Sequence, residues 1–383
     1  MRWCLARPAG VFSSLLFVLV APAQAHHPGV GGGTGGGGPI NTISAGTLDE
    51  GQIAAAVRYE FIRLGQLSDA SLLAAASQGN HAHSMRSIES AALSVAYGVT
   101  NDFTVSVRLP GVRRSGIREP AESEDMLSGG HMGGFDSSSM SSLMSSGGIN
   151  ARGSSAGFSD VTLLGQYRFH QNAATGTEAA VLFGFKAPTG STRERDNFGQ
   201  LFEAEFQPGS GSFDGLIGAA FTKRFGRWSF DASGLYMVIG KGTQDTDLGD
   251  RFLFGAGVSY RLIGPIGSAK EVALHDKCQK EQNRLQEFCL YHANHDHRDM
   301  MKTPYTLDLV LEFNGEWHDK QRISGVADPN SGGTTVYLSP GVRVGVDRFS
   351  GFVSVGVPVI NQHNGVQSKP DFRVLTGIAA RLN

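Results

Sequence analysis

Hydrophobic and polar residues alternate with a period of two over most of the chain. In one such stretch Ile53, Val57 and Phe61 share an apolar phase, whereas Arg58 and Glu60 lie on the opposite phase. A helix would instead repeat its apolar positions at intervals of three and four residues. The pattern therefore predicts β-strands that have one apolar and one polar face.

About twelve stretches of this kind can be counted, and each is long enough to cross a bilayer when tilted. They cover residues 52–64, 90–99, 103–109, 158–170, 177–187, 212–225, 227–240, 250–262, 305–317, 334–346, 350–360 and 371–382. An even number of strands is what a single-chain bacterial outer-membrane barrel requires. We therefore expect an all-β fold, an antiparallel outer-membrane β-barrel of about 12 strands that occupies residues 50–383.

The connections between these stretches alternate in length. The short links are residues 100–102, 170–176, 225–227 and 346–349, and the longer ones are 65–87, 110–157, 188–211, 241–249, 318–333 and 361–370. In outer-membrane barrels short turns face the periplasm and long loops face outside. Aromatic residues of the apolar phase lie near the short turns, as in an interfacial girdle: Tyr97, Phe103, Tyr167, Phe169, Trp228 and Tyr260. A soluble β-sandwich also alternates, but it needs no such collection of long loops at one end.

The N-terminal residues predict a secretory signal peptide over residues 1–25. Two arginines precede an apolar run from Val11 to Ala21, and a small-residue A-x-A site ends at Ala25. An uncleaved anchor is the alternative, but the run is short for a bilayer. Export together with the barrel pattern predicts the outer membrane of a Gram-negative bacterium. Because a glycine run follows the leader, we expect residues 26–49 to form a flexible tether.

Composition excludes several classes of protein. The 383 residues carry a formal net charge of −2, so there is no basic excess for binding nucleic acid. Only 18% of the residues are charged, which is too few for a highly charged disordered chain. No predicted strand places an interior histidine near a serine, so we expect neither an enzyme nor a cofactor. The expected partners are membrane lipid and a small solute.

If the apolar phase faces lipid, the polar phase lines the lumen. The charged candidates there are Arg58, Glu60, Arg108, Asp160, Arg168, Glu178, Asp214, Asp231, Arg251, Asp308, Glu312 and Arg343. Both signs are represented, so no strong ion selectivity is expected, and the same residues could simply satisfy a polar interior. The stretch from Ser90 to Gly98 adds only small inner residues, which leaves room for a solute or an inserted loop. The loop from Thr189 to Gln207 carries four large apolar side chains, which should fold into the barrel mouth or pack on its rim.

Histidine, methionine and cysteine gather in the connections. The candidate metal ligands are His81, His83, His131, Met132, His292, His295 and His297. Imidazole and thioether suit copper, and imidazole also suits zinc, so a metal ion is a candidate partner; the alternative is solvated low-complexity loops without metal.

The connection over residues 263–304 is an insertion with apolar residues at helical intervals, and strand parity places it on the periplasmic side. It holds Cys278 and Cys289, which we expect to form a disulfide in an oxidising compartment, with a Cys/His metal site as the alternative. One unbroken helix would hold the cysteines about 16 Å apart, so a disulfide requires a helical hairpin.

Three motifs carry a resemblance to a known family. They are FKAPTGS at residues 185–191, QPGSGSFD at residues 207–214 and YLSPG at residues 337–341. In their order and spacing, from about residue 50 to the C terminus, the chain resembles the outer-membrane transporters grouped as the MetA-pathway of phenol degradation family. The resemblance implies an outer-membrane channel for small, hydrophobic or aromatic solutes, and none of the motifs is catalytic. A metal-handling barrel for copper or zinc, using the His/Met-rich loops, is the alternative.

Overall fold

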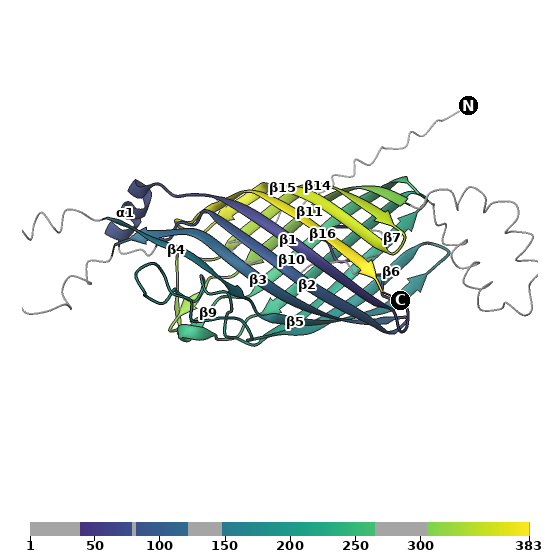
Figure 1. Cartoon of the computed structure of the whole chain (residues 1–383), viewed down its shortest axis with the longest axis horizontal. Helices are drawn as coiled ribbons and strands as arrows, with labels where there is room; N and C mark the ends of the chain where they lie inside the picture. Colours follow the sequence, from purple (N-terminus) through teal and green to yellow (C-terminus); the bar gives the residue numbers. More distant parts are fainter. Residues whose placement is uncertain (1–38, 79–81, 122–147, 265–304, 383) are drawn as a thin grey trace, which may run out of the picture.

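The computed structural model describes residues 39–78, 82–121, 148–264 and 305–382. In these residues twelve long antiparallel strands close into a barrel, which confirms the predicted fold (Figure 1). Closure pairs each of these twelve strands on both sides, and a barrel in hydrocarbon requires this because lipid offers no partner for a free backbone amide. Each of the twelve stretches predicted from the alternation contributes a wall strand.

The wall strands follow one another round the barrel in chain order. They are β1 (Ile53–Gly65), β2 (Ser87–Thr100), β3 (Phe103–Pro120), β5 (Val161–Asn172), β6 (Thr177–Ala187), β7 (Asp214–Phe225), β8 (Trp228–Val238), β10 (Arg251–Ile263), β11 (Tyr305–His318), β14 (Gly333–Val346), β15 (Phe349–His363) and β16 (Lys369–Arg381). The ring closes because β1 pairs with both β2 and β16.

One predicted loop is shorter than expected. The alternation suggests a connection over residues 110–157, but β3 continues to Pro120 and pairs there with β4 (Ile149–Phe158). Nearer its start, β3 pairs with β5 instead, so β4 and β5 continue the same line of the wall. The alternation stops before the end of β3, because the part of a strand that extends beyond the bilayer does not need an apolar outer face.

With the exception of residues 264–304, short turns and long connections occupy opposite ends of the barrel. Turns at residues 101–102, 173–176, 226–227 and 347–348 lie at one end, which we call the turn end. β1 begins and β16 ends there, since Ala54 pairs with Arg381. The 264–304 connection also joins strands at this end, because Ile263 of β10 pairs with Leu307 of β11. The predicted helical hairpin and the cysteines Cys278 and Cys289 lie outside the described residues, as does the signal peptide.

The opposite end, which we call the loop end, carries the other secondary structure. Here α1 (Asp69–Ser77) begins after Ser68, whose hydroxyl oxygen accepts a hydrogen bond from the Ser71 N–H. Figure 1 shows α1 and the C terminus at opposite ends of the molecule. Three short strands form a second small sheet at the loop end: β9 (Thr246–Asp247), β12 (Arg322–Ile323) and β13 (Val326–Ala327). Among the described residues, no helix combines the length and hydropathy that a bilayer crossing requires.

The apolar phase of the wall points outward. Val57 and Val95 are 49% and 42% exposed, whereas Ala96, the neighbour of Val95, is 3% exposed. Near the turn end the exposed side chains are aromatic, and the rings of Trp228 and Tyr260 lie 4.7 Å apart between centroids. The exposed aromatic residues there include Tyr97, Tyr167, Phe169 and Trp228. An apolar surface of this extent belongs in hydrocarbon, and the aromatic residues lie where an interfacial girdle forms.

Candidate channel lumen

The charged residues predicted for the lumen all lie on the inner phase of the wall. Those that are buried are Arg58, Glu60, Asp160, Glu178, Asp214, Asp231, Arg251, Asp308, Glu312 and Arg343. The other two, Arg108 and Arg168, are half-buried. Burial of charge is costly unless each group finds an opposite charge or a hydrogen-bond partner, so the pairing of these residues defines the interior.

At the turn end the inner charges form a connected network. Arg168 lies 2.8 Å from Asp102 and 3.4 Å from Glu178, measured between nitrogen and oxygen. Glu178 also lies 2.8 Å from Arg224 of the neighbouring β7. The network joins the wall strands to the turn at residues 101–102, so it stiffens this end rather than presenting a free charge to a solute.

Nearer the loop end, Arg373 of β16 is the centre of a second network of polar contacts. One guanidinium nitrogen of Arg373 lies 3.7 Å from Glu60, and another donates to the side-chain oxygens of Asn314 and Ser339 at 3.1 and 3.2 Å. The guanidinium also lies over the ring of Tyr337, 4.3 Å from its centroid. A polar side of the lumen therefore runs over β16, β1, β11 and β14.

Residues 39–48, which we call the luminal segment, lie inside the barrel. The backbone N–H groups of Asn41 and Thr42 donate to the Glu312 carboxylate at 3.0 and 2.8 Å. The Arg343 guanidinium donates to the Pro39 carbonyl oxygen, and that of Arg58 donates to the Asn41 side-chain oxygen. The sequence predicts a flexible tether over residues 26–49, whereas residues 39–48 are bound to the wall in the structure.

The rest of the luminal segment also uses wall side chains as its partners. Backbone N–H groups of Ile43, Ala45 and Leu48 donate to hydroxyl oxygens of the wall at 2.8 to 3.1 Å. The acceptors are Ser233, Thr222 and Thr104. None of these bonds belongs to a strand ladder, which explains why the alternation gave no sign of the insertion. The small inner residues of β2 do point to an inserted chain, because Ala96 packs against Leu48.

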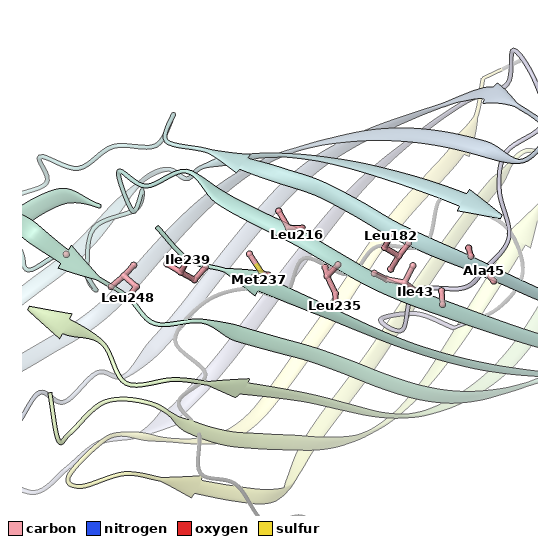
Figure 2. Close-up of a cluster of buried hydrophobic side chains, with 11 residues drawn as sticks. Ile43, Ala45, Leu182, Leu216, Leu235, Met237, Ile239 and Leu248 are labelled. Atoms are coloured by element: carbon pink, nitrogen blue, oxygen red, sulfur yellow. The ribbon is translucent and has the colours of Figure 1, made fainter. Parts of the chain in front are cut away.

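One side of the lumen is apolar in its middle part. Between charged residues near the two ends of β6, β7 and β8, the inner faces of these strands carry a row of aliphatic side chains, which we call the apolar strip (Figure 2). Its members are Ala180, Leu182, Leu216, Ala220, Leu235, Met237 and Ile239. Ile43 and Ala45 of the luminal segment cover one end, and Leu248 lies at the other. The alternation alone does not predict this strip, because its residues and the charged inner residues lie at the same alternate positions along the strands.

The loop end is closed by apolar side chains. In the 188–213 loop Phe202 and Phe206 are 1% and 4% exposed, whereas Phe198 is 60% exposed. The two buried rings pack into a cluster, the mouth cluster, whose other members are Ile62, Leu64, Met85, Ile88, Val112 and Ile117. The sequence allows this loop either to fold into the barrel mouth or to pack on its rim. Phe202 and Phe206 lie in the mouth, and Phe198 is exposed.

Two of the family-like motifs meet where this loop is anchored. A Cβ atom on Gly209 would lie 2.6 Å from the carbonyl carbon of Gly190, so the two backbones touch and neither position has room for a side chain. Beside them the Asp160 carboxylate accepts hydrogen bonds from the N–H of Gly190 at 2.9 Å and of Ser210 at 2.8 Å. Lys186 lies 3.1 Å from this carboxylate, and it therefore ties β6 to the loop. The motifs act as an anchor for the loop.

A cavity of about 70 Å³ remains between the luminal segment and the wall. Small side chains from β1 and β2, among them Ala54, Ser94 and Ala96, line it together with Arg58 and Arg108. Space for water therefore remains beside the two arginines, between the luminal segment and the wall.

Of the candidate metal ligands, only His83 is among the described residues. Its Nδ1 lies 3.4 Å from Glu119 Oε2, and its Nε2 lies 3.2 Å from Glu203 Oε2. These three residues come together from three separate segments at the loop end and are spaced closely enough to hold one metal ion. The sequence analysis missed the two glutamates, because nothing in their spacing links residues 83, 119 and 203. The other candidates, His81, His131, Met132, His292, His295 and His297, lie outside the described residues.

Electrostatics at this cluster are dominated by negative charge. Burial lowers the pKa of His83, but the nearby carboxylates of Glu203 and Glu119 outweigh it and raise that pKa well above 6.5. Burial, together with the charge on Glu203, raises the pKa of Glu205 to about 7, although the charge on His83 opposes the shift. The cluster therefore attracts cations.

Comparisons with known proteins agree with the barrel fold. The family model described as MetA-pathway of phenol degradation matches residues 89–274, which confirms the predicted resemblance and includes the two motifs at the loop anchor. The COG4313 outer membrane channel from Pseudomonas putida F1 has a TM-score of 0.51 at 14% identity, covering 88% of this chain and 98% of that one. At this identity the likeness concerns the fold, which is that of a Gram-negative outer-membrane channel, as the sequence predicts.

Two toluene transporters are less similar. TodX from P. putida has a TM-score of 0.39 at 10% identity, covering 88% of this chain and 91% of its own. TbuX from Ralstonia pickettii has a TM-score of 0.36 at 10% identity, with 88% and 90% covered. These scores are too low to support an argument about this chain. No curated protein matches the chain.

Proposed function

Because residues 89–274 match the family model and the fold is that of an outer-membrane channel, we propose that this barrel conducts small solutes of low polarity across the outer membrane. Hydrophobic and aromatic solutes are the class that suits it best. The proposal requires no cofactor and no chemical step.

The apolar strip is the observation that carries this proposal. Porin interiors are polar because they hold water, so a row of leucine, isoleucine and methionine side chains along a lumen is unfavourable unless something apolar covers it. Ile43 and Ala45 of the luminal segment cover one end of the strip. A solute with an apolar body would gain the same burial when the segment moves away, while its polar edge would face the charged side of the lumen.

The way the luminal segment is held is consistent with movement. Its backbone donates to Glu312, Ser233, Thr222 and Thr104, all of them side chains of the wall. Water can replace such partners, so each bond to a hydroxyl contributes about 1 kcal/mol net and each bond to the Glu312 carboxylate about 1.5 to 3 kcal/mol. The segment can therefore leave without breaking any ladder of the barrel.

Solute flux in liposomes tests the proposal. We expect aromatic acids to permeate faster than sugars of similar mass, and we expect Leu235→Gln or Met237→Gln to lower that ratio because each makes the strip polar. Ser229→Gln is the matched control, since Ser229 lies on the same inner phase of β8 outside the strip. Equal permeation of both solute classes, or an unchanged ratio in both strip variants, would argue against the proposal.

A further inference from the structure

Three segments that are remote in the sequence meet around His83. This residue lies between α1 and β2, Glu119 lies near the end of β3, and Glu203 lies in the 188–213 loop. The His83 side chain is 16% exposed and that of Glu119 is 12% exposed, whereas that of Glu203 is 39% exposed. Two of the three groups are thus largely enclosed, and the third faces water.

The enclosed groups are held in place by their own neighbours. Arg152 lies 3.0 Å from Glu119 Oε1 and 2.8 Å from Asp196 Oδ2, so the Glu119 carboxylate is anchored by one oxygen while the other faces His83. The His83 ring meets Phe206 edge-on, with centroids 5.2 Å apart and planes at 78°. A fixed imidazole supported by a fixed carboxylate is the arrangement that proteins use to orient metal ligands.

We propose that His83 and Glu203 bind one divalent ion of the zinc class, with Glu119 orienting the His83 imidazole. Zinc binds imidazole nitrogen and carboxylate oxygen at about 2.0 to 2.2 Å, so two neighbouring ligands of one ion lie roughly 3.2 to 3.5 Å apart. The separation of 3.2 Å between His83 Nε2 and Glu203 Oε2 matches that spacing. The proton of the imidazole then stays on Nδ1, facing Glu119, and water completes the coordination on the exposed side of Glu203.

The ion would hold the 188–213 loop in place at the barrel mouth. Glu203 is the direct neighbour of Phe202 and is three residues from Phe206, the two rings that close the mouth cluster. A metal bond from Glu203 to His83 therefore holds this loop against the connection between α1 and β2. This role is independent of the proposed solute, because the ion stays in the loops and does not enter the lumen.

Zinc titration of the purified full-length chain tests the site. After removal of metal with a chelator, calorimetry with zinc chloride is carried out on the wild type and on H83Q, E203Q and E194Q. Glu194 is the matched control, since it is a carboxylate of the same loop that accepts a hydrogen bond from Ser191 instead. We expect H83Q and E203Q each to lose one equivalent of bound zinc that E194Q retains. If both variants bind as many equivalents as the wild type, the cluster is a histidine ion pair only and the proposal is wrong.

A second measurement guards against misfolding and reports on the loop itself. Folded barrels are identified by their heat-dependent migration in gels, and only folded variants are compared. Arg193 and Arg195 are exposed in the same loop and offer trypsin cleavage sites. We expect zinc to slow cleavage there in the wild type and in E194Q, but not in E203Q. Cleavage in the wild type at the same rate with and without zinc would show that the ion does not hold the loop, whatever the result of the flux assay.

Discussion

Two segments that lie in the lumen and in its mouth are held in different ways. The luminal segment, residues 39–48, combines hydrogen bonds from its backbone to Glu312 and to hydroxyl groups of the wall with small buried aliphatic contacts through Ile40, Ile43 and Leu48. The 188–213 loop is held by the buried rings of Phe202 and Phe206 and by its glycine anchor. Water can replace the hydrogen-bond partners of the luminal segment one by one, whereas removal of a single buried phenylalanine side chain costs about 3 to 5 kcal/mol. We therefore expect the luminal segment to leave its place before the loop does.

Deletion of the luminal segment should have the largest effect. Without residues 39–48 the middle of the lumen loses its occupant, so we expect resolvable single-channel openings in planar bilayers where the full chain shows almost none. Deletion of residues 26–37 is the control, because it removes glycine-rich chain and leaves the luminal segment in place. Identical conductance of the two deletions would mean that the segment is not the closure.

Phe202→Ala and Phe206→Ala should release the loop. Each substitution removes a buried ring from the mouth cluster, and we expect it to destabilise the docked loop by about 3 to 5 kcal/mol. The measurement is the rate of trypsin cleavage at Arg193 and Arg195 in the folded barrel. Phe198→Ala, at a residue that is 60% exposed, is the control and should leave the rate unchanged. Equal rates in all three variants would show that burial of the rings does not hold the loop.

Gly209→Ala should loosen the same loop by a smaller amount. The added Cβ would lie 2.6 Å from the Gly190 carbonyl carbon, so the two backbones must separate, at a cost of about 1 to 3 kcal/mol. Faster cleavage of the loop is the expected result. Gly215→Ala is the control, since a Cβ at Gly215 meets nothing within 4 Å. If Gly209→Ala is as resistant as Gly215→Ala, the backbone contact is not the anchor.

Glu312→Gln should have the smallest effect. The amide keeps one oxygen to accept hydrogen bonds from Asn41 and Thr42 but loses the charge, so the hold on the luminal segment should weaken by about 1 kcal/mol. We expect rare openings, fewer than in the deletion. Glu316→Gln, on the same face of β11 nearer the loop end, serves for comparison. More frequent openings in Glu316→Gln than in Glu312→Gln would place the main hold elsewhere.

The wall was predictable from the sequence because its outer phase meets one uniform environment. Lipid imposes the same requirement on every strand, so Val57 and Val95 carry the same signal although they lie on different strands. The inner phase meets a different neighbour at each position. Glu60 lies beside Arg373, whereas Leu182 lies in the apolar strip. No local sequence pattern predicts which of these neighbours an inner residue will have.

The candidate sites show the same division. The sequence predicted that Arg58 and Glu312 belong to the lumen, but it gave no indication that their partners are residues 41 and 42 of a supposed tether. It also singled out His83, but Glu119 and Glu203 approach that ring only because β3 and the 188–213 loop converge at the mouth.

By itself the sequence determined the strands, their parity and the order of turns and loops, since these follow from local alternation and from chain length between strands. Only the tertiary structure decided what fills the barrel. Closure of the wall brings residues 39–48, 83, 119 and 203 within reach of partners far away in the chain, and hydrogen bonds, buried rings and paired charges form according to distance in space rather than separation in sequence.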